Sequence, residues 1–388
     1  MANLLPQADW TRREDLAALI AALGPGNARY VGGAVRDTLL DLPVKDVDIA
    51  TPLLPQEVMD RLKAASLKAI PTGIEHGTIT APLPGGPVEI TTLRHDVSTD
   101  GRRATVAFAS DWQEDAARRD FTINALYADP ASHEIHDYFN GQADLAARRV
   151  RFIGDARQRI REDHLRILRY FRFQARFGSQ PADDEAENSC AELAGTLANL
   201  SRERVAMELL NLLALPDPSL TIVRMSELSV LKVILPEANP ATLAVLVTTE
   251  AAHHVPPDPI RRLAALLPSD PVVASKVATR FRLSTVQRRR LTTAAGRSDG
   301  INDPHVLAYR LGLVEAVDRL LLTGRDPSAV ADWTVPILPI KGGDIIARGV
   351  PAGPEVARLL RAVEDRWVAE GFPAKARVQT LLDEVLSQ

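Results

Sequence analysis

The stretch GGAVRD (residues 32–37), followed by DVD (residues 46–48), decides how the first part of this chain folds. A paired glycine opens a helix, and the two aspartates lie on a predicted strand. Residues i and i+2 of a strand share a face, so Asp46 and Asp48 project together while Val47 faces the packed side. Adjacent carboxylates repel unless a cation neutralises them, and Mg²⁺ is a hard ion that takes oxygen ligands. The sequence therefore predicts a strand that carries a divalent-metal site.

A third carboxylate is predicted to join this pair. Residues 77–83 and 87–93 flank the turn sequence PGG and give a β-hairpin signal. Alternation places Glu89 opposite Val88 and Ile90, on the face where it meets the aspartates. The glycine pair lets backbone N–H groups approach a polyphosphate. Three surface acids without a metal would also show a D-x-D pattern. The combination nevertheless favours metal-assisted nucleotidyl transfer over a dinucleotide fold, since G-x-G-x-x-G is absent.

Length and composition set broad limits on the fold and the compartment. A chain of 388 residues is too long for one core and predicts roughly two to four structural units. Cys190 is the single cysteine, which excludes an intrachain disulfide or a cysteine-based zinc site and fits a cytoplasmic protein. No secretory signal or membrane-spanning run is expected. The net charge is −4, yet residues 146–176 hold ten arginines against three acids. This arginine stripe favours phosphate or base contacts over a merely solvated helix face.

The predicted fold class is α+β, with an N-terminal α/β part on a mixed or antiparallel sheet and helices from Asp155 onward. Proline pairs break the second part into helical pieces, and no fixed repeat is evident. Residues 96–111 are polar and predict a mobile loop. The other expected elements are helices at 13–23, 34–40 and 55–65 and strands at 29–31 and 135–138.

A second constellation lies at residues 162–172, where a predicted helix places Asp163 and Arg166 on one face. An intrahelical salt bridge explains such a pair, but hydrogen-bond chemistry offers a sharper hypothesis. A carboxylate only accepts and a guanidinium only donates, whereas cytosine and adenine each present an amino donor beside a ring-nitrogen acceptor. Uracil and guanine present a carbonyl beside an N–H. A fixed Asp–Arg pair therefore predicts selection of C and A over U and G.

These motifs resemble those of class II tRNA nucleotidyltransferases, the CCA-adding enzymes, and of the related bacterial poly(A) polymerases. The blocks that carry the resemblance are VGGAVRDTLL, DVDIAT, VEITTLR, RRDFTINALY and GDARQRIREDHLRILRYFRF, with GGDIIARGVPAGPEVARLL as a less specific tail block. Together they span most of the chain. The resemblance implies a catalytic head (1–150), a helical neck for base recognition (151–215), a helical body (216–300) and a helical tail that binds tRNA (301–388).

The resemblance also implies roles for single residues. Asp46, Asp48 and Glu89 would bind two Mg²⁺ ions and carry catalysis. The residues implied to contact the nucleotide are Gly32, Gly33 and Arg36 at the triphosphate, Arg119, Asp120 and Asn124 around the ribose, Asp163 and Arg166 at the base, and Arg169 near the phosphates or the base-reading pair.

The implied reaction is stepwise, untemplated addition of C, C and A to the 3′ end of tRNA from CTP and ATP, with release of pyrophosphate. Recognition of the acceptor stem is expected to use shape and phosphates, because A-form grooves hide base edges. A solvated surface is the equal alternative for five weak candidates for RNA contacts: Arg261, Arg262, Arg288, Arg289 and Arg290. The sequence does not define the oligomeric state.

Three rival hypotheses share these motifs. A poly(A) polymerase would add long runs of A, although the chain lacks a long basic C-terminal extension. A partial enzyme that adds only CC or only A would differ around residues 96–103. A catalytically silent RNA-binding protein predicts the loss of a carboxylate, whereas all three are present.

Overall fold

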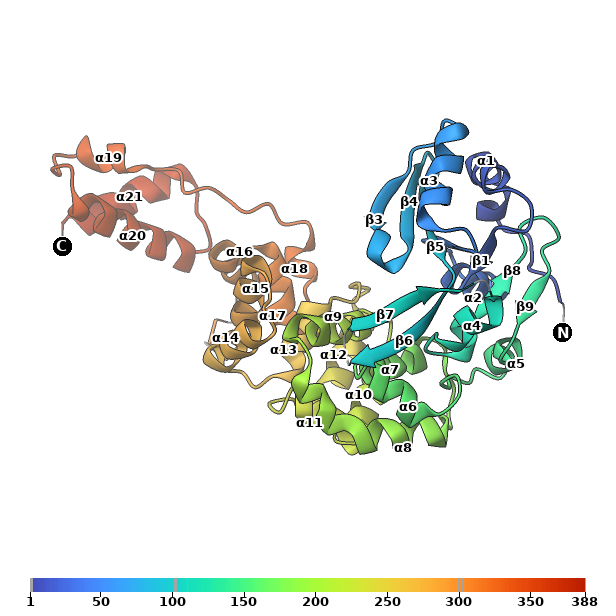
Figure 1. Ribbon diagram of the computed structural model, residues 1–388. Coiled ribbons are helices and arrows are strands. Elements are labelled where there is room, and N and C mark those ends of the chain that lie inside the picture. The colour runs from blue at the N-terminus through green and yellow to red at the C-terminus, as the bar shows by residue number, and fades with distance from the viewer. Residues whose placement is uncertain (1–2, 101–102, 110, 299, 302, 388) are drawn as a thin grey trace. The chain divides into compact units, whose positions relative to one another are not determined.

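A mixed β-sheet organises the N-terminal part of the chain (Figure 1), with seven strands among the residues that the computed structural model describes: 3–100, 103–109, 111–298, 300–301 and 303–387. The strand order is β3-β4-β5-β2-β1-β8-β9. β2 and β5 pair in parallel, and the other neighbours pair antiparallel. The strands are β1 (Arg29–Val31), β2 (Val47–Thr51), β3 (Ile70–Gly73), β4 (Thr78–Leu83), β5 (Gly86–Thr92), β8 (Leu126–Ala128) and β9 (Ile135–Asp137). The predicted α+β class with a mixed head sheet is confirmed.

Two hairpins complete the β structure of this region. β4 and β5 form the predicted hairpin, in a register that pairs Thr80 with Glu89. β6 (Arg94–Asp100) and β7 (Arg103–Phe108) form a separate two-stranded sheet. The predicted loop at 96–111 is therefore wrong for these strands, because a polar segment can still form a backbone hydrogen-bond ladder. Within that prediction, residues 101–102 and 110 lie outside the described residues.

The first compact unit runs to Pro240 and includes Arg280–Leu283. The helices predicted at 13–23, 34–40 and 55–65 are present, and α1 packs against α3. The α-helices of this unit are α1 (Glu14–Leu23), α2 (Gly33–Leu39), α3 (Pro55–Ala64), α4 (Trp112–Ala117), α5 (Gly141–Ala146), α6 (Ala156–Glu162), α7 (Arg166–Phe177), α8 (Asp184–Leu193), α9 (Arg202–Leu213), α10 (Ser219–Glu227) and α11 (Val230–Ile234).

An aromatic cluster joins helix α7 to the end of the head. Phe121 contacts Phe152 and Phe173 with ring centroids 5.0 and 5.1 Å apart, and Phe152 stacks on Tyr170 at 5.8 Å. Such pairs add specific geometry to the burial of large apolar side chains. The cluster therefore places the middle of α7 beside the segment that follows α4.

The second unit comprises Ala241–Thr279 and the chain from Ser284 onward. Trp367 lies in its C-terminal core, packed with residues of α19 to α21. The helices are α12 (Ala241–Ala252), α13 (Pro259–Leu266), α14 (Pro271–Arg280), α15 (Thr285–Ala295), α16 (Pro304–Leu311), α17 (Leu313–Leu322), α18 (Ser328–Ala331), α19 (Gly342–Ile346), α20 (Pro354–Ala369) and α21 (Lys375–Leu386). The finer division at 151, 216 and 301 stays a prediction.

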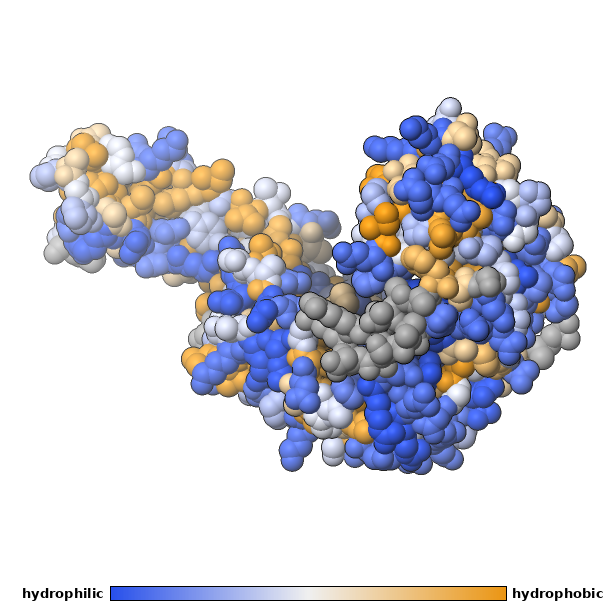
Figure 2. Space-filling view, in the orientation of Figure 1, coloured by the Kyte–Doolittle hydropathy of each residue, from blue (hydrophilic) through white to orange (hydrophobic). Residues whose placement is uncertain are grey.

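The surface over helices α6 and α8 is mainly hydrophilic on the face that Figure 2 shows. Within the described ranges, no helix combines the length and the apolar character that crossing a membrane requires.

Candidate active site

Three acidic residues lie at one end of the β2–β5 strand pair. The parallel register places Asp48 of β2 directly across from Glu89 of β5. Asp46 lies immediately before β2, two residues from Asp48 and on the same face. Val47 and Ile49 point the other way and are buried. The apolar half of this alternating pattern thus anchors the strand and leaves the acids facing outward.

The electrostatics of this acidic face fit a bound cation. Burial and the charge of Glu89 raise the pKa of Asp48 to about 6, while Arg119 opposes the shift and Asp46 adds to it. Carboxylate oxygens are the ligands that hard divalent ions prefer. Among the described residues, however, no group of three His, Cys, Asp or Glu side chains is gathered closely enough to enclose a metal ion.

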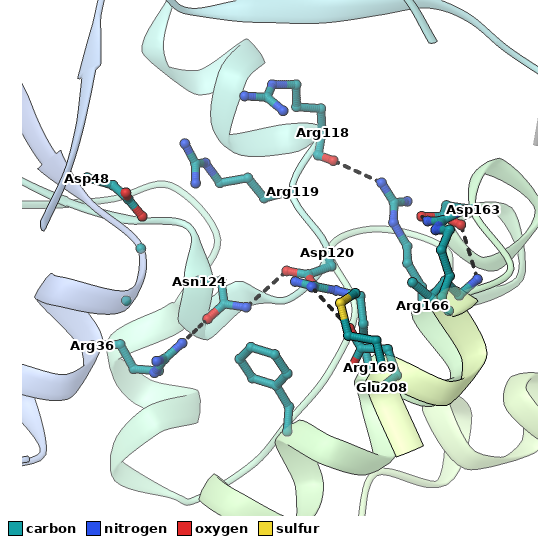
Figure 3. A pocket seen from close by; sticks show the side chains of 16 residues that line it. Arg36, Asp48, Arg118, Arg119, Asp120, Asn124, Asp163, Arg166, Arg169 and Glu208 are labelled. Atoms are coloured by element: carbon teal, nitrogen blue, oxygen red, sulfur yellow. Dashed lines mark hydrogen bonds and ion pairs between the residues drawn. The ribbon is translucent and has the colours of Figure 1, made fainter. Parts of the chain in front are cut away.

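A cavity of about 540 Å³ runs from Asp48 to the start of helix α7. Figure 3 shows Asp48 on one side of it and Asp163 with Arg166 on the other, with Arg119 and Asp120 between them. Asp46 and Glu89 do not line it. The lining residues are Gly32, Gly33, Arg36, Asp48, Arg118, Arg119, Asp120, Asn124, Asp163, Leu165, Arg166, Arg169, Phe173, Arg204, Met207 and Glu208.

Gly32 forms the floor of the cavity near Asp48. Its backbone has φ +67°, and a Cβ atom there would lie 3.5 Å from the carbonyl oxygen of Asn124 and 3.7 Å from Nη1 of Arg119. Glycine adopts a positive φ without steric cost. The residue therefore lets a ligand approach the backbone closely at the point where α2 begins.

Arg36 also lines the cavity, but its side chain is almost fully buried and is held by protein partners. Its guanidinium donates to Asn124 and to Asp37, and it lies 4.2 Å from the centroid of the Phe177 ring. Burial lowers the pKa of Arg36, although Asp37 counteracts this effect. The side chain thus links α2 to α7 and holds Asn124 in place.

A buried carboxylate organises two cavity arginines. Asp115 of α4 accepts hydrogen bonds from Arg118 at 2.7 and 2.9 Å, from Arg119 at 3.0 Å and from the Tyr127 hydroxyl at 2.6 Å. Burial alone would raise the pKa of Asp115, but the charges of Arg119 and Arg118 outweigh it and lower the pKa to about 2. Both guanidinium groups are therefore held in fixed positions along the cavity wall.

A second hydrogen-bond chain connects the segment after α4 to helices α7 and α9. Asp120 accepts from Nε of Arg169 at 2.8 Å and from the Asn124 amide at 3.0 Å. Burial raises the pKa of Asp120, yet the charge of Arg169 and the hydrogen bond from Asn124 lower it to about 2. Glu208 of α9 lies 3.8 Å from Arg169 and accepts from Arg172 at 2.6 Å. Asp120, Asn124 and Arg169, all predicted from sequence, thus form one connected network.

The predicted helical pair of Asp163 and Arg166 is wrong in its local geometry. Helix α6 ends at Glu162, Asp163 has an extended backbone, and α7 begins at Arg166. Arg166 binds Glu162 at 2.7 Å and the carbonyl oxygens of Arg159 and Arg118. The break occurs because the Asp163 carboxylate accepts the Leu165 amide hydrogen at 3.1 Å, which starts a new helix. Both side chains nevertheless line the cavity.

Helix α9 contributes residues that sequence reasoning missed. Arg204 donates to Asp163 at 2.8 Å, and Met207 and Glu208 follow one turn later on the same face. No local motif connects these residues to Asp163, which lies about forty positions earlier in the chain. The other lining residues outside the predicted set are Arg118, Leu165 and Phe173.

The prediction of RNA contacts is wrong for Arg261 and Arg262. Both side chains are buried, and each donates to Glu250, at 2.7 and 2.8 Å. Helix α13 is buried along Ile260–Leu266, so its arginines neutralise interior acids. Arg290 is also engaged, with Asp318 and Asp258. Arg288 and Arg289 are exposed, and their contact with RNA stays a prediction.

Comparison with known proteins agrees with this arrangement. The family described as "Poly A polymerase head domain" matches residues 28–151, and "Probable RNA and SrmB- binding site of polymerase A" matches residues 183–242. The chain is 34% identical to CCA tRNA nucleotidyltransferase 1, mitochondrial, of Homo sapiens, over 92% of this chain and 85% of that protein. It is 44% identical to the CCA-adding enzyme of Oceanobacillus iheyensis over 47% of this chain and 45% of that enzyme.

Structural comparison extends the similarity along the chain. The crystal structure of Bacillus stearothermophilus CCA-adding enzyme in complex with CTP matches with a TM-score of 0.78 and 28% identity, over 96% of this chain and 98% of that one. Sequence and fold thus agree over both units. This chain belongs to the class II CCA-adding family of tRNA nucleotidyltransferases.

Proposed function

We propose that this protein adds C, C and A to the 3′ ends of tRNA, with CTP and ATP as substrates and pyrophosphate as the leaving group. The observation that carries this proposal is a single cavity that links the carboxylate face of β2 to the fixed side chains of Asp163 and Arg166. A nucleoside triphosphate has its reacting phosphates at one end and its base at the other. The cavity likewise has Asp48 at one end and Asp163 with Arg166 at the other.

The phosphate end of the cavity would act by positioning. Gly32 and Gly33 expose backbone N–H groups to the triphosphate, and Arg119 supplies a guanidinium that Asp115 holds in place. Arg36 supports this end from below through Asn124. The 3′-hydroxyl oxygen of the tRNA attacks the α-phosphorus, the bond to pyrophosphate breaks, and the reaction depends mainly on alignment and charge neutralisation.

The three carboxylates of Asp46, Asp48 and Glu89 would hold divalent metal. We propose that the metal is Mg²⁺ and that two ions bind. The raised pKa of Asp48 supports this assignment: burial is its largest cause, and the neighbouring charges of Glu89 and Asp46 add to it, so a bound cation would offset both effects. When bound, the metal would lower the pKa of the attacking hydroxyl and stabilise the departing pyrophosphate oxygen.

The base end of the cavity would select C and A. Asp163 keeps acceptor capacity for a base amino group, because each carboxylate oxygen has two lone pairs. Arg166 is anchored by Glu162 and two backbone carbonyls, and its remaining N–H groups can donate to a ring nitrogen. Around the ribose we place Asp120 and Asn124, with Arg169 bridging toward the base.

The test is incorporation into tRNA that ends before CCA, supplied with CTP alone, ATP alone or both. We expect two C residues with CTP, and one A after them when both are present. Long runs of A would favour a poly(A) polymerase, and addition of only CC or only A would favour a partial enzyme. Failure to use either nucleotide would contradict the proposal.

Two further features of the protein extend this proposal. The tRNA would lie along the helical part of the chain, where Arg288 and Arg289 are exposed cations. A cytoplasmic location is supported by the single cysteine, Cys190. The human relative, by contrast, is named as mitochondrial. Fractionation of cells that express the full chain distinguishes the two compartments.

A further inference from the structure

Met207 differs from the other apolar residues of the cavity in its exposure. Among the described residues that line the cavity, Leu165 and Phe173 are 4% and 6% exposed, whereas Met207 is 52% exposed. An isolated exposed apolar side chain on an outer surface needs no explanation. A half-exposed thioether inside a charged cavity is different, because a ligand that fills the cavity will remove it from water.

The position of Met207 on α9 places it beside the base-reading pair. Arg204, Met207 and Glu208 are spaced i, i+3 and i+4, so they share one face of the helix. Arg204 binds Asp163 at 2.8 Å, and Glu208 binds Arg172 of α7 at 2.6 Å. These two contacts fix the α9 face against α7, and Met207 lies between them.

The chemistry of a nucleobase matches what this wall offers. A base presents polar groups at its edge and apolar surface on its two faces. When the edge of the base hydrogen-bonds to Asp163 and Arg166, the flat face of the ring still needs a contact. That face is apolar, so an apolar side chain covers it better than a polar one. Methionine makes favourable sulfur–aromatic contacts, and its unbranched chain adapts to partners of different size.

We infer that Met207 contacts the face of the incoming base and adjusts to both the cytosine and the larger adenine ring. This inference rests on the proposed function, which requires one site to accept two bases of unequal size. A β-branched residue at this position has restricted χ1 freedom and could not make the same adjustment. Met207 is therefore a specificity-determining residue that acts through shape rather than hydrogen bonding.

The test compares Met207→Ala and Met207→Ile with wild type in steady-state incorporation of CTP and ATP into tRNA. Met207→Ala should raise KM for both nucleotides about two- to tenfold with little change in kcat, as expected for loss of a sulfur–aromatic contact. Met207→Ile should raise KM for ATP more than KM for CTP. Because Met207 is half exposed, both variants should fold, which thermal unfolding checks.

Leu220→Ala is the matched control, since Leu220 is 75% exposed on α10 and does not line the cavity. It should leave both KM values unchanged. Unchanged KM values in Met207→Ala, or equal effects of Met207→Ile on the two nucleotides, would overturn the inference while the proposed function stands. A wild-type protein that adds neither C nor A would remove both.

Discussion

Arg204 of helix α9 donates a hydrogen bond of 2.8 Å to the carboxylate of Asp163, and the same carboxylate accepts a hydrogen bond from the Leu165 amide. The proposed base-reading carboxylate is thus oriented by a helix about forty residues further along the chain. Arg166, its predicted partner, is held separately by Glu162. The two side chains proposed to read the base therefore have different side-chain partners, and each side chain can be perturbed alone.

Replacing Arg204 by Gln should blur base selection without abolishing catalysis. The lost charge-assisted hydrogen bond is worth about 1–2 kcal/mol, which corresponds to roughly tenfold weaker discrimination against UTP and GTP. Single-turnover incorporation of each nucleotide measures this ratio. Glu203→Gln is the control. Glu203 lies on the same helix as Arg204, and its exposed side chain pairs with Arg282. Equal selectivity in Arg204→Gln and wild type would show that the Leu165 amide suffices.

Replacing Asp48 by Asn should lower the rate of nucleotide incorporation about a thousandfold or more. The reason is that a metal ion stabilises transition-state charge by several kcal/mol. The same variant should lose the rise in melting temperature that Mg²⁺ gives to the wild-type protein. Asp41→Asn, at an exposed position outside the cavity, should change neither. Metal stabilisation that survives in Asp48→Asn would place the ion elsewhere.

The pH dependence of stability tests the same residue without metal. The pKa of Asp48 is raised from 3.8 to about 6, so the folded state favours the protonated form. The contribution of this carboxyl group to stability is fully present below its pKa in the unfolded chain, 3.8, and is lost as the pH rises through its folded-state pKa of about 6. In EDTA, Asp48→Asn should therefore unfold at a higher temperature than wild type at pH 7, with the difference shrinking toward pH 4. A difference independent of pH would contradict this titration.

Replacing Asp115 by Asn should destabilise the protein and raise KM for both nucleotides. Removing one member of a buried charge network costs about 3 kcal/mol, because Arg118 and Arg119 lose their shared partner. Denaturant unfolding gives the stability change, and steady-state kinetics give KM. Glu114→Gln tests an exposed acid of the same helix and should be neutral in both assays. Normal KM values would mean that the two arginines hold their positions without Asp115.

The arginines of the second unit should separate into structural and surface groups. Arg261→Gln should lower the free energy of unfolding by about 3 kcal/mol, because Glu250 and Asp318 lose a buried partner. Arg289→Gln should leave unfolding unchanged, since this side chain is 72% exposed. If Arg289 binds a tRNA phosphate, its loss should reduce the salt dependence of tRNA affinity by about one charge. Identical salt slopes would assign Arg289 to the solvated surface.

The elements that follow from local patterns could be predicted well. Helices α1, α2 and α3 and the β4–β5 hairpin agree with periodicity and turn residues. Strand alternation predicts the face on which Glu89 lies, but its position directly opposite Asp48 depends on the parallel pairing of β2 with β5, which local sequence does not define. The β6–β7 pair was missed although its sequence carries a signal, since the stretch RATVAF (residues 103–108) is mainly apolar and follows the turn-favouring sequence Asp100-Gly101.

By itself the sequence identified the side chains to which we assign the chemistry: the acids at 46, 48 and 89, the glycine pair, and the proposed base-reading pair of Asp163 and Arg166. Only the tertiary structure decided which groups hold those side chains in place. Arg204 and Asp115 act through contacts between separate elements, and Arg261 is buried although its local sequence resembles a basic surface. Spacing along a chain encodes helix and strand faces, whereas partners across a fold depend on how whole elements pack.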